Sequence, residues 1–180
     1  MIIGISGFAQ AGKDSIGQRL TEQHGFQRFA FADKVKEMAL RLNAYAPRTD
    51  GISLRGVTRL GGWEGAKNYP YIRQLLIDIG EGAREVIGPD VWLDAVVRAI
   101  PPHTPVVVTD VRFRNEYDWI TDHGEMWRVH RPGYGPVSEG PSENELTPLP
   151  FDRHFVNDSD IPTLHLHVDQ AMQEIESLAP

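Results

Sequence analysis

The stretch Gly7-Phe8-Ala9-Gln10-Ala11-Gly12-Lys13-Asp14 follows a short apolar run, Met1-Ile2-Ile3-Gly4-Ile5, and precedes a segment with helical spacing of apolar residues. Glycines at both ends of such a turn let consecutive backbone N–H groups point inward at a polyphosphate. The ammonium group of Lys13 would reach the β- and γ-phosphates, and a helix beginning near Lys13 would add its positive N-terminus. The stretch therefore predicts a phosphate-binding loop between a first strand and a first helix, with a nucleoside triphosphate as its ligand.

Asp14 occupies a position that usually carries serine or threonine, whose hydroxyl binds Mg²⁺. Here a hydroxyl follows one residue later, at Ser15. A carboxylate can bind a hard cation directly or through water, and it can equally stabilise the N-terminus of a helix through the helix dipole. The alternative for the whole loop is a glycine-rich turn without a ligand, but the glycine spacing, the lysine and the context together favour nucleotide binding.

The composition is that of an ordinary globular domain of 180 residues, of which 41% are hydrophobic and 24% charged. The formal net charge of −7 argues against a nucleic acid polymer as partner, because duplex binding relies on a basic face. The chain has no cysteine, which excludes a disulfide scaffold, a zinc–thiolate site and a cysteine nucleophile. No apolar run approaches the length of a membrane span, and no basic region precedes the first strand. We therefore expect no membrane partner, no signal peptide and a cytoplasmic location.

Strand and helix patterns alternate along the chain, which favours an α/β fold with a doubly wound, mainly parallel sheet of about five strands. The clearest strand is the continuous β-branched run at 105–109, which is typical of a strand buried on both faces of a parallel sheet. We expect the other strands at 1–6, 27–31, 126–130 and 154–156, and helices at 13–23, 32–42, 72–86, 91–100, 116–123 and 164–178.

Two segments rich in proline and glycine interrupt this alternation. Residues 43–70 lose the periodicity and are predicted to form a long irregular surface insertion. Residues 132–153, flanked by Arg131 and Arg153, are predicted to form either a lid that excludes water from the phosphates or a plain loop. The whole chain is expected to be a single domain, 1–180, with a core of 1–42, 72–131 and 154–180.

Ligands of parallel sheets bind beyond the carboxyl ends of the strands. The groups that fall at such ends are the loop at 7–12, Asp33, Asp110, Arg131 and Asn157. Asp110, after its apolar strand, would hold Mg²⁺ through water or polarise an attacking hydroxyl. The alternative is a carboxylate paired with the nearby Arg112, whose guanidinium fork also matches a phosphate.

Arg73 and Arg84 lie eleven positions apart on one predicted helix, so they can share a face. There they would either hold a monophosphate or form surface salt bridges with neighbouring carboxylates. His165 and His167 diverge on the final predicted helix, and we do not expect a metal site at this pair.

Four stretches match a known family: 7–15, 29–37, 109–116 and 156–158. The most specific is Asp110-Val111-Arg112-Phe113-Arg114-Asn115-Glu116, and the loop ending Gly12-Lys13-Asp14-Ser15 is also usual in the family. On these residues the chain resembles the phage deoxynucleoside monophosphate kinases, members of the nucleoside monophosphate kinase group of P-loop folds. The likeness covers most of the chain apart from 43–70 and much of 132–153.

This resemblance implies a P-loop three-layer α/β/α fold with a five-stranded, mainly parallel sheet, a substrate-binding helical insertion and a lid. It implies an enzyme that transfers the γ-phosphoryl group of ATP to a deoxynucleoside monophosphate (dNMP) in the presence of Mg²⁺, giving dNDP and ADP. The resemblance implies a cytoplasmic location, which would be the cytoplasm of an infected bacterial host if the chain is phage-encoded. It leaves the oligomeric state undecided between a monomer and a homodimer.

The resemblance also assigns roles by position. ATP would be held by Gly7, Ala9, Ala11, Gly12, Lys13, Asp14, Ser15 and Asn157. Mg²⁺ would be held by Asp14, Ser15 and Asp110. The acceptor would contact Asp33, Lys36, Arg73, Arg84 and Arg112, and the catalytic groups would be Lys13, Arg131, Asp110 and Asp33.

Two other functions remain compatible with the sequence. A kinase for another small acceptor, such as dephospho-coenzyme A, would share the same architecture. A nucleotide-dependent switch or binding module would hydrolyse nucleotide slowly and act on a protein. The predicted lid at 132–153, with the arginines that flank it, argues against the switch, because a switch needs no second phosphate site.

Overall fold

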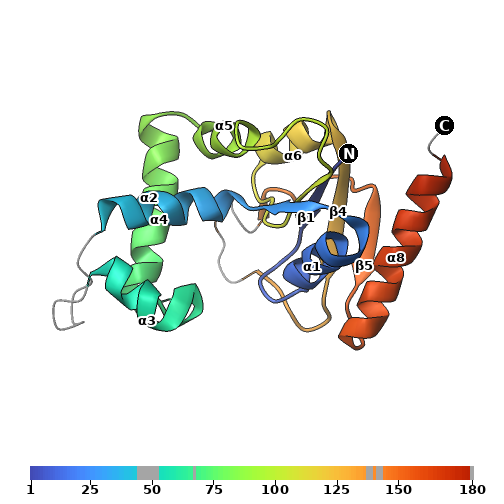
Figure 1. Cartoon of the computed structure of the whole chain (residues 1–180), viewed down its shortest axis with the longest axis horizontal. Helices are drawn as coiled ribbons and strands as arrows, with labels where there is room; N and C mark the ends of the chain where they lie inside the picture. The colour runs from blue at the N-terminus through green and yellow to red at the C-terminus, as the bar shows by residue number, and fades with distance from the viewer. Residues whose placement is uncertain (44–52, 67, 137–139, 141–143, 179–180) are drawn as a thin grey trace. The chain divides into compact units, whose positions relative to one another are not determined.

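The computed structural model describes residues 1–43, 53–66, 68–136, 140 and 144–178 (Figure 1). These residues form two compact units, one from Met1–Ala30 and Ala99–Pro180, the other from Phe31–Arg98. Parts of the expected insertion and lid, at 44–52, 67, 137–139 and 141–143, lie outside the described residues.

The first unit contains a five-stranded sheet in the order β2-β3-β1-β4-β5, and every pairing is parallel. This confirms the expected α/β fold. β2 pairs with β3 and not with β1, so the first two strands of the chain are not neighbours in the sheet. The strands are β1 (Ile2–Ser6), β2 (Gln27–Phe29), β3 (Val106–Val108), β4 (Gly124–His130) and β5 (Arg153–Val156).

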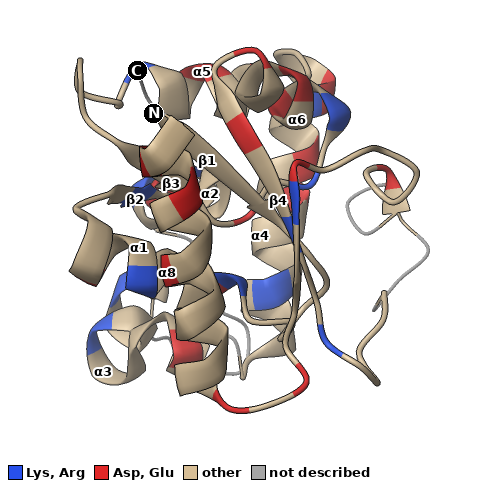
Figure 2. Cartoon of the chain, turned by 90° about the vertical axis from the view of Figure 1, so that its right-hand side faces the viewer, with Lys and Arg blue, Asp and Glu red and all other residues tan. Residues whose placement is uncertain are grey.

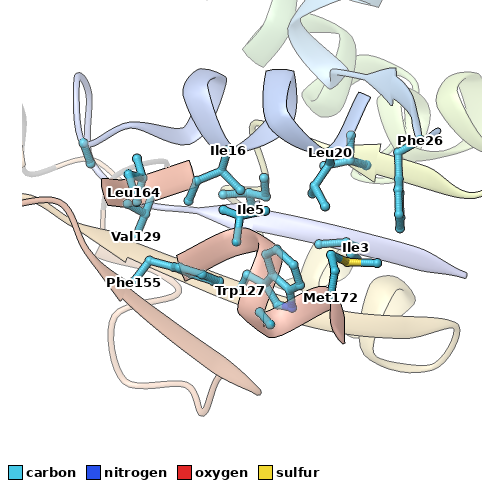
Figure 3. Packing of buried hydrophobic residues seen from close by; sticks show 14 residues of the cluster. Ile3, Ile5, Ile16, Leu20, Phe26, Trp127, Val129, Phe155, Leu164 and Met172 are labelled. Carbon is cyan, nitrogen blue, oxygen red and sulfur yellow. The ribbon is translucent and has the colours of Figure 1, made fainter. Parts of the chain in front are cut away.

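Helices cover both faces of this sheet. On one face, α1 (Lys13–His24) and α8 (Ile161–Leu178) pack over alternate residues of the strands. Figure 3 shows Ile3 and Ile5 of β1 among residues of both helices. On the other face lies α6 (Arg114–Thr121), whose Ile120 comes within 2.5 Å of the place where a Cβ on Gly4 would stand. The result is three layers, helix on sheet on helix, as expected for a doubly wound sheet.

The two helices of the first face are joined by a charged cluster. The guanidinium of Arg19 on α1 donates two hydrogen bonds to the carboxylate of Asp169 on α8, at 2.9 and 2.5 Å. The ring nitrogen Nε2 of His24 lies 2.9 Å from the same carboxylate. The hydrogen bond from Arg19 is the main reason why the pKa of Asp169 falls to about 2.

Replacing Asp169 with asparagine is expected to reduce stability at pH 7 by about 1 kcal/mol, since a carboxylate that is partly exposed to solvent gains less than its full pKa shift. The folded pKa lies below the unfolded value of 3.8, so the stabilisation is complete above about pH 5 and is lost as the pH falls through the folded pKa of about 2. Urea unfolding of both proteins at pH 7 and pH 3 measures the difference. Asp94→Asn, at an exposed pair with Arg98 3.8 Å away, is the matched control. An Asp169 effect that is the same at both pH values would contradict the assignment.

The second unit consists of helices α2 (Phe31–Leu42), α3 (Leu54–Ala66), α4 (Pro70–Val86) and α5 (Val91–Val97). The indole N–H of Trp92 on α5 donates to the carbonyl of Gly80 on α4 at 2.9 Å, and Val35 of α2 faces the same glycine. A separate apolar cluster joins α2, α3 and α4 through Ala39, Leu54, Val57, Ala66 and Ile72.

Helix α3 corrects the expectation that 43–70 is irregular, which is wrong over Leu54–Ala66. Four glycines within this helix obscure the helical spacing of its apolar residues in the sequence. Leu54, Val57 and Ala66 are nevertheless buried, and their packing stabilises a helix whose intrinsic propensity is low. The helix is kinked at Gly62, where φ is 62° and ψ is −171°. Within the described residues, no helix is long and apolar enough to cross a membrane.

Candidate functional site

The loop between β1 and α1 depends on glycine at both ends. Gly7 has φ 157°, and a Cβ there would stand 2.4 Å from the backbone carbonyl oxygen of Val129 on β4. Gly12 has φ 115°, and a Cβ there would stand 2.7 Å from the side-chain nitrogen of Asn157. Strand β4 and the residue after β5 therefore leave no room for side chains at these two positions.

Lys13, the first residue of α1, folds back over the loop. Its ammonium nitrogen donates to the carbonyl oxygens of Gly7 at 2.7 Å and Phe8 at 2.8 Å. The same Phe8 carbonyl accepts the backbone N–H of Ala11 at 3.2 Å, which closes the loop across Ala9 and Gln10. A positive charge and the N-terminus of a twelve-residue helix thus meet at one place, which is the arrangement that binds a phosphate.

A cavity of about 600 Å³ opens beside this loop. Asn157 forms part of its wall: its amide donates to the carbonyl of Ala11 at 2.9 Å, and its backbone N–H donates to His130 at 2.8 Å. Arg131 forms another part, with its guanidinium 4.6 Å from the ring centre of Tyr134 and 3.4 Å from the carbonyl of Gln10. The lining is Gln10, Gly12, Asp14, Ser15, Arg131, Asn157, Ser159, Asp160, Ile161 and Pro162.

Four of the eight residues expected to hold ATP line the cavity: Gly12, Asp14, Ser15 and Asn157. Asp14 and Ser15 line it from the first turn of α1, and Arg131 and Asn157 line it from the ends of β4 and β5. By contrast, Arg153 lies at the start of β5 and forms salt bridges with Glu125 and Glu174. Of the two arginines that flank 132–153, only Arg131 is at the carboxyl edge of the sheet.

Asp110 and Arg112 lie in the segment that follows β3 (Val106–Val108), and this segment is beside the start of the phosphate loop. The backbone N–H of Val111 donates to the carbonyl of Ile5 at 3.2 Å, one residue before β1 ends at Ser6. Asp110 therefore stands next to the strand end from which the phosphate loop departs. Among the described residues, no group of three or more His, Cys, Asp and Glu side chains could hold a metal ion.

Glu116 has a role that sequence reasoning did not assign, although it lies in the most specific motif. It is 1% exposed, and its Oε2 accepts the backbone N–H groups of Arg112 at 2.9 Å and Phe113 at 3.1 Å. One buried carboxylate oxygen therefore fixes the turn that carries Asp110 and Arg112. The sequence did contain a signal for this role: Glu116 lies three residues after the helix N-cap Phe113, which is the spacing of a capping box.

Replacing Glu116 with alanine is expected to cost about 2 kcal/mol or more of stability, because two backbone N–H groups near a buried site lose their acceptor. Glu116→Gln keeps an acceptor oxygen of the same reach and should lose less. Urea unfolding of the three proteins gives the order wild type, glutamine, alanine. An alanine variant as stable as the glutamine variant would contradict this role.

Apart from Arg112, the residues expected to bind the phosphate-accepting substrate all lie in the second unit. On α2, the ammonium of Lys36 lies 2.7 Å from the carboxylate of Asp33 and 5.9 Å from the ring centre of Trp63. On α4, the guanidinium of Arg84 donates to the carbonyl of Pro89 at 2.8 Å, and Arg73 is exposed. Asp33 and Lys36 are thus an ion pair one helical turn apart.

Known proteins share this fold and part of the sequence. No family model matches the chain. A protein of Acanthamoeba polyphaga mimivirus, named "Putative deoxynucleotide monophosphate kinase", is 28% identical over 183 residues, covering 93% of this chain and 94% of that protein. Shikimate kinase from Acinetobacter baumannii in complex with shikimate matches with a TM-score of 0.51 at 12% identity, over 98% of this chain and 93% of its own. Dephospho-CoA kinase from Campylobacter jejuni gives a TM-score of 0.49 at 15% identity, and the match covers 97% of this chain and 96% of that one.

The fold is that of the P-loop kinases. The shikimate kinase structure carries this assignment, and the mimivirus protein adds sequence similarity along almost the whole chain. Together they support a phosphotransferase that acts on a small molecule.

Proposed function

We propose that this chain is a deoxynucleoside monophosphate kinase of the phage type named above, which transfers the γ-phosphoryl group of ATP to a dNMP. The observation that supports it best is the glycine-hinged loop with Lys13 across it, which opens into a cavity lined by Arg131 and Asn157. Similarity to the mimivirus protein with that name gives independent support.

ATP fits the loop and cavity. The backbone between Gly7 and Gly12, including Ala9 and Ala11, would surround the phosphates, and Lys13 would carry the positive charge. Asn157 would lie near the base. A cavity of about 600 Å³ is of the size that takes a ligand as large as a nucleotide.

Mg²⁺ also fits, because it needs only one or two carboxylates when substrate phosphates and water complete its coordination. Asp14, Ser15 and Asp110 would hold it. When bound, the ion would neutralise charge on the phosphates during transfer.

The acceptor would be held by Asp33, Lys36, Arg73, Arg84 and Arg112. In the reaction, an oxygen of the acceptor 5′-phosphate forms a bond to the γ-phosphorus, and the bond from that phosphorus to the bridging oxygen of ADP breaks. The acceptor phosphate is already anionic near neutral pH, so positioning and charge neutralisation matter more than a general base. Residues 132–153, with Arg131 at their root, would act as a lid that keeps water from the γ-phosphate.

An acceptor panel tests the proposal. The protein, ATP and Mg²⁺ are mixed with each dNMP, each matching ribonucleotide, dephospho-coenzyme A, shikimate or no acceptor, and ADP release is followed. At least one dNMP should raise ADP release far above the rate without acceptor, and the product should be the dNDP. Stimulation by dephospho-coenzyme A or shikimate alone would contradict the proposal, as would ATP binding that no acceptor turns into turnover.

A further inference from the structure

Arg128 lies behind the phosphate loop and has no place in the site described so far. It is the only lysine or arginine of β4, the strand labelled β4 in Figure 2, and stands in register with Ser6, the last residue of β1. Its Nη1 donates to the hydroxyl of Ser6 at 2.9 Å, and Ser6 is only 3% exposed. The positive charge is thereby anchored beside the residue from which the loop departs.

Two aromatic rings flank this guanidinium. Its central carbon lies 5.2 Å from the ring centre of Phe8 and 5.4 Å from that of Phe151. Phe8 is the second residue of the phosphate loop, whereas Phe151 lies near the end of the segment that connects β4 to β5, two residues before β5 begins. Phe151 is itself held edge-on by the ring of Tyr117 on α6, at 5.8 Å between centres. One cation therefore contacts the loop, the sheet and the end of the expected lid.

Arg128 can influence the phosphate site through the backbone of Phe8. Its carbonyl oxygen accepts both the ammonium of Lys13 at 2.8 Å and the N–H of Ala11 at 3.2 Å. Movement of the Phe8 ring would therefore move the atom that supports Lys13 and closes the loop. A planar guanidinium can stack on aromatic faces and donate to a hydroxyl at once, which a lysine ammonium cannot do in the same geometry.

We propose that Arg128 is a positioning residue of the phosphate loop. Stacked on Phe8 and bonded to Ser6, it keeps the loop backbone and Lys13 in place for a triphosphate and links them to the end of the 132–153 segment at Phe151. The inference rests on the proposed nucleotide site, and it predicts an effect on ATP rather than on the acceptor.

Arg128→Met, which keeps length but removes charge and donors, tests the proposal by steady-state kinetics with the best acceptor of the panel. The KM for ATP should rise and kcat should fall, each by about tenfold, which corresponds to 1.4 kcal/mol each. The KM for the acceptor should stay within twofold. Arg128→Lys should lie between the wild type and the methionine variant. Arg153→Met is the matched control, because Arg153, the first residue of the neighbouring strand β5, bonds the carboxylates of Glu125 and Glu174. The kinetic constants of this variant should equal those of the wild type.

A double-mutant cycle with Phe8→Leu separates positioning from general destabilisation. If Arg128 acts through Phe8, the two changes together should cost hardly more than either alone. Should Arg128→Met fail to fold, the cycle is measured with Arg128→Lys instead.

Three results would overturn the inference: an unchanged KM for ATP in Arg128→Met, equal rises in both KM values, or additive effects in the cycle. In each case the wild type still turns over, and the proposed function stands. A wild type that neither binds ATP nor phosphorylates any acceptor would overturn both.

Discussion

Replacing Lys13 with alanine is expected to lower kcat by between about 10² and 10³-fold, the usual cost of removing one preorganised positive group from the developing charge of a transition state. The ammonium lies over the loop, within 2.8 Å of two of its carbonyl oxygens, so its charge is fixed where phosphates would bind. The fold should survive, because Lys13 is only partly buried and contributes nothing to the apolar core.

Circular dichroism and ADP release measure the two parts of this prediction. Lys34→Ala serves as the control, since that lysine lies on α2 and bonds Glu37 at 3.3 Å. Turnover close to wild type in Lys13→Ala would contradict the assignment of the loop. Loss of turnover in the control as well would show that the assay reports on folding instead.

Replacing Gly7 with alanine is expected to cost about 3 kcal/mol of stability, combining backbone strain with the overpacking of a fixed neighbour. The new Cβ would stand 2.4 Å from the Val129 carbonyl oxygen and 2.9 Å from its Cγ1, and a backbone atom of a central strand cannot move aside as a side-chain end can. Relief would require the loop to shift away from β4, so ATP affinity should fall at least tenfold.

Gly25→Ala is the matched control for this prediction. Gly25 has φ 70° and ends α1, but a Cβ there would meet no atom within 4 Å. It should therefore cost only the strain of the left-handed conformation, about 1 kcal/mol, and leave ATP binding intact. Unfolding in urea and calorimetric titration with ATP compare the two. Equal costs in both variants would contradict the close approach of β4 to the loop.

The features that the sequence predicted are those encoded by neighbours along the chain. The loop at 7–12 carries its glycines and lysine within a few residues, and the run at 105–109 identifies a central strand by composition alone. Asn157 was placed by a simple rule, as a polar residue at a strand end, and its amide does reach the carbonyl of Ala11. Its part in binding a base stays a prediction.

The features that the sequence did not predict depend on distant partners. The order of the strands is set by pairing between β2 and β3, which are separated by the whole second unit. Helix α3 is stabilised by burial against α2 and α4, which outweighs its glycines. Arg128 gains its role only from Ser6 and Phe8, some 120 positions earlier. Local patterns carry no information on any of these contacts.

Calorimetric titration of the folded wild type with ATP in the presence of Mg²⁺ tests the central claim most directly. The loop, Lys13 and the adjoining cavity predict saturable binding of one ATP per chain, weakened strongly in Lys13→Ala and hardly in Lys34→Ala. A well-folded protein that gives no binding heat at any temperature tested and does not compete for a fluorescent ATP analogue would contradict it.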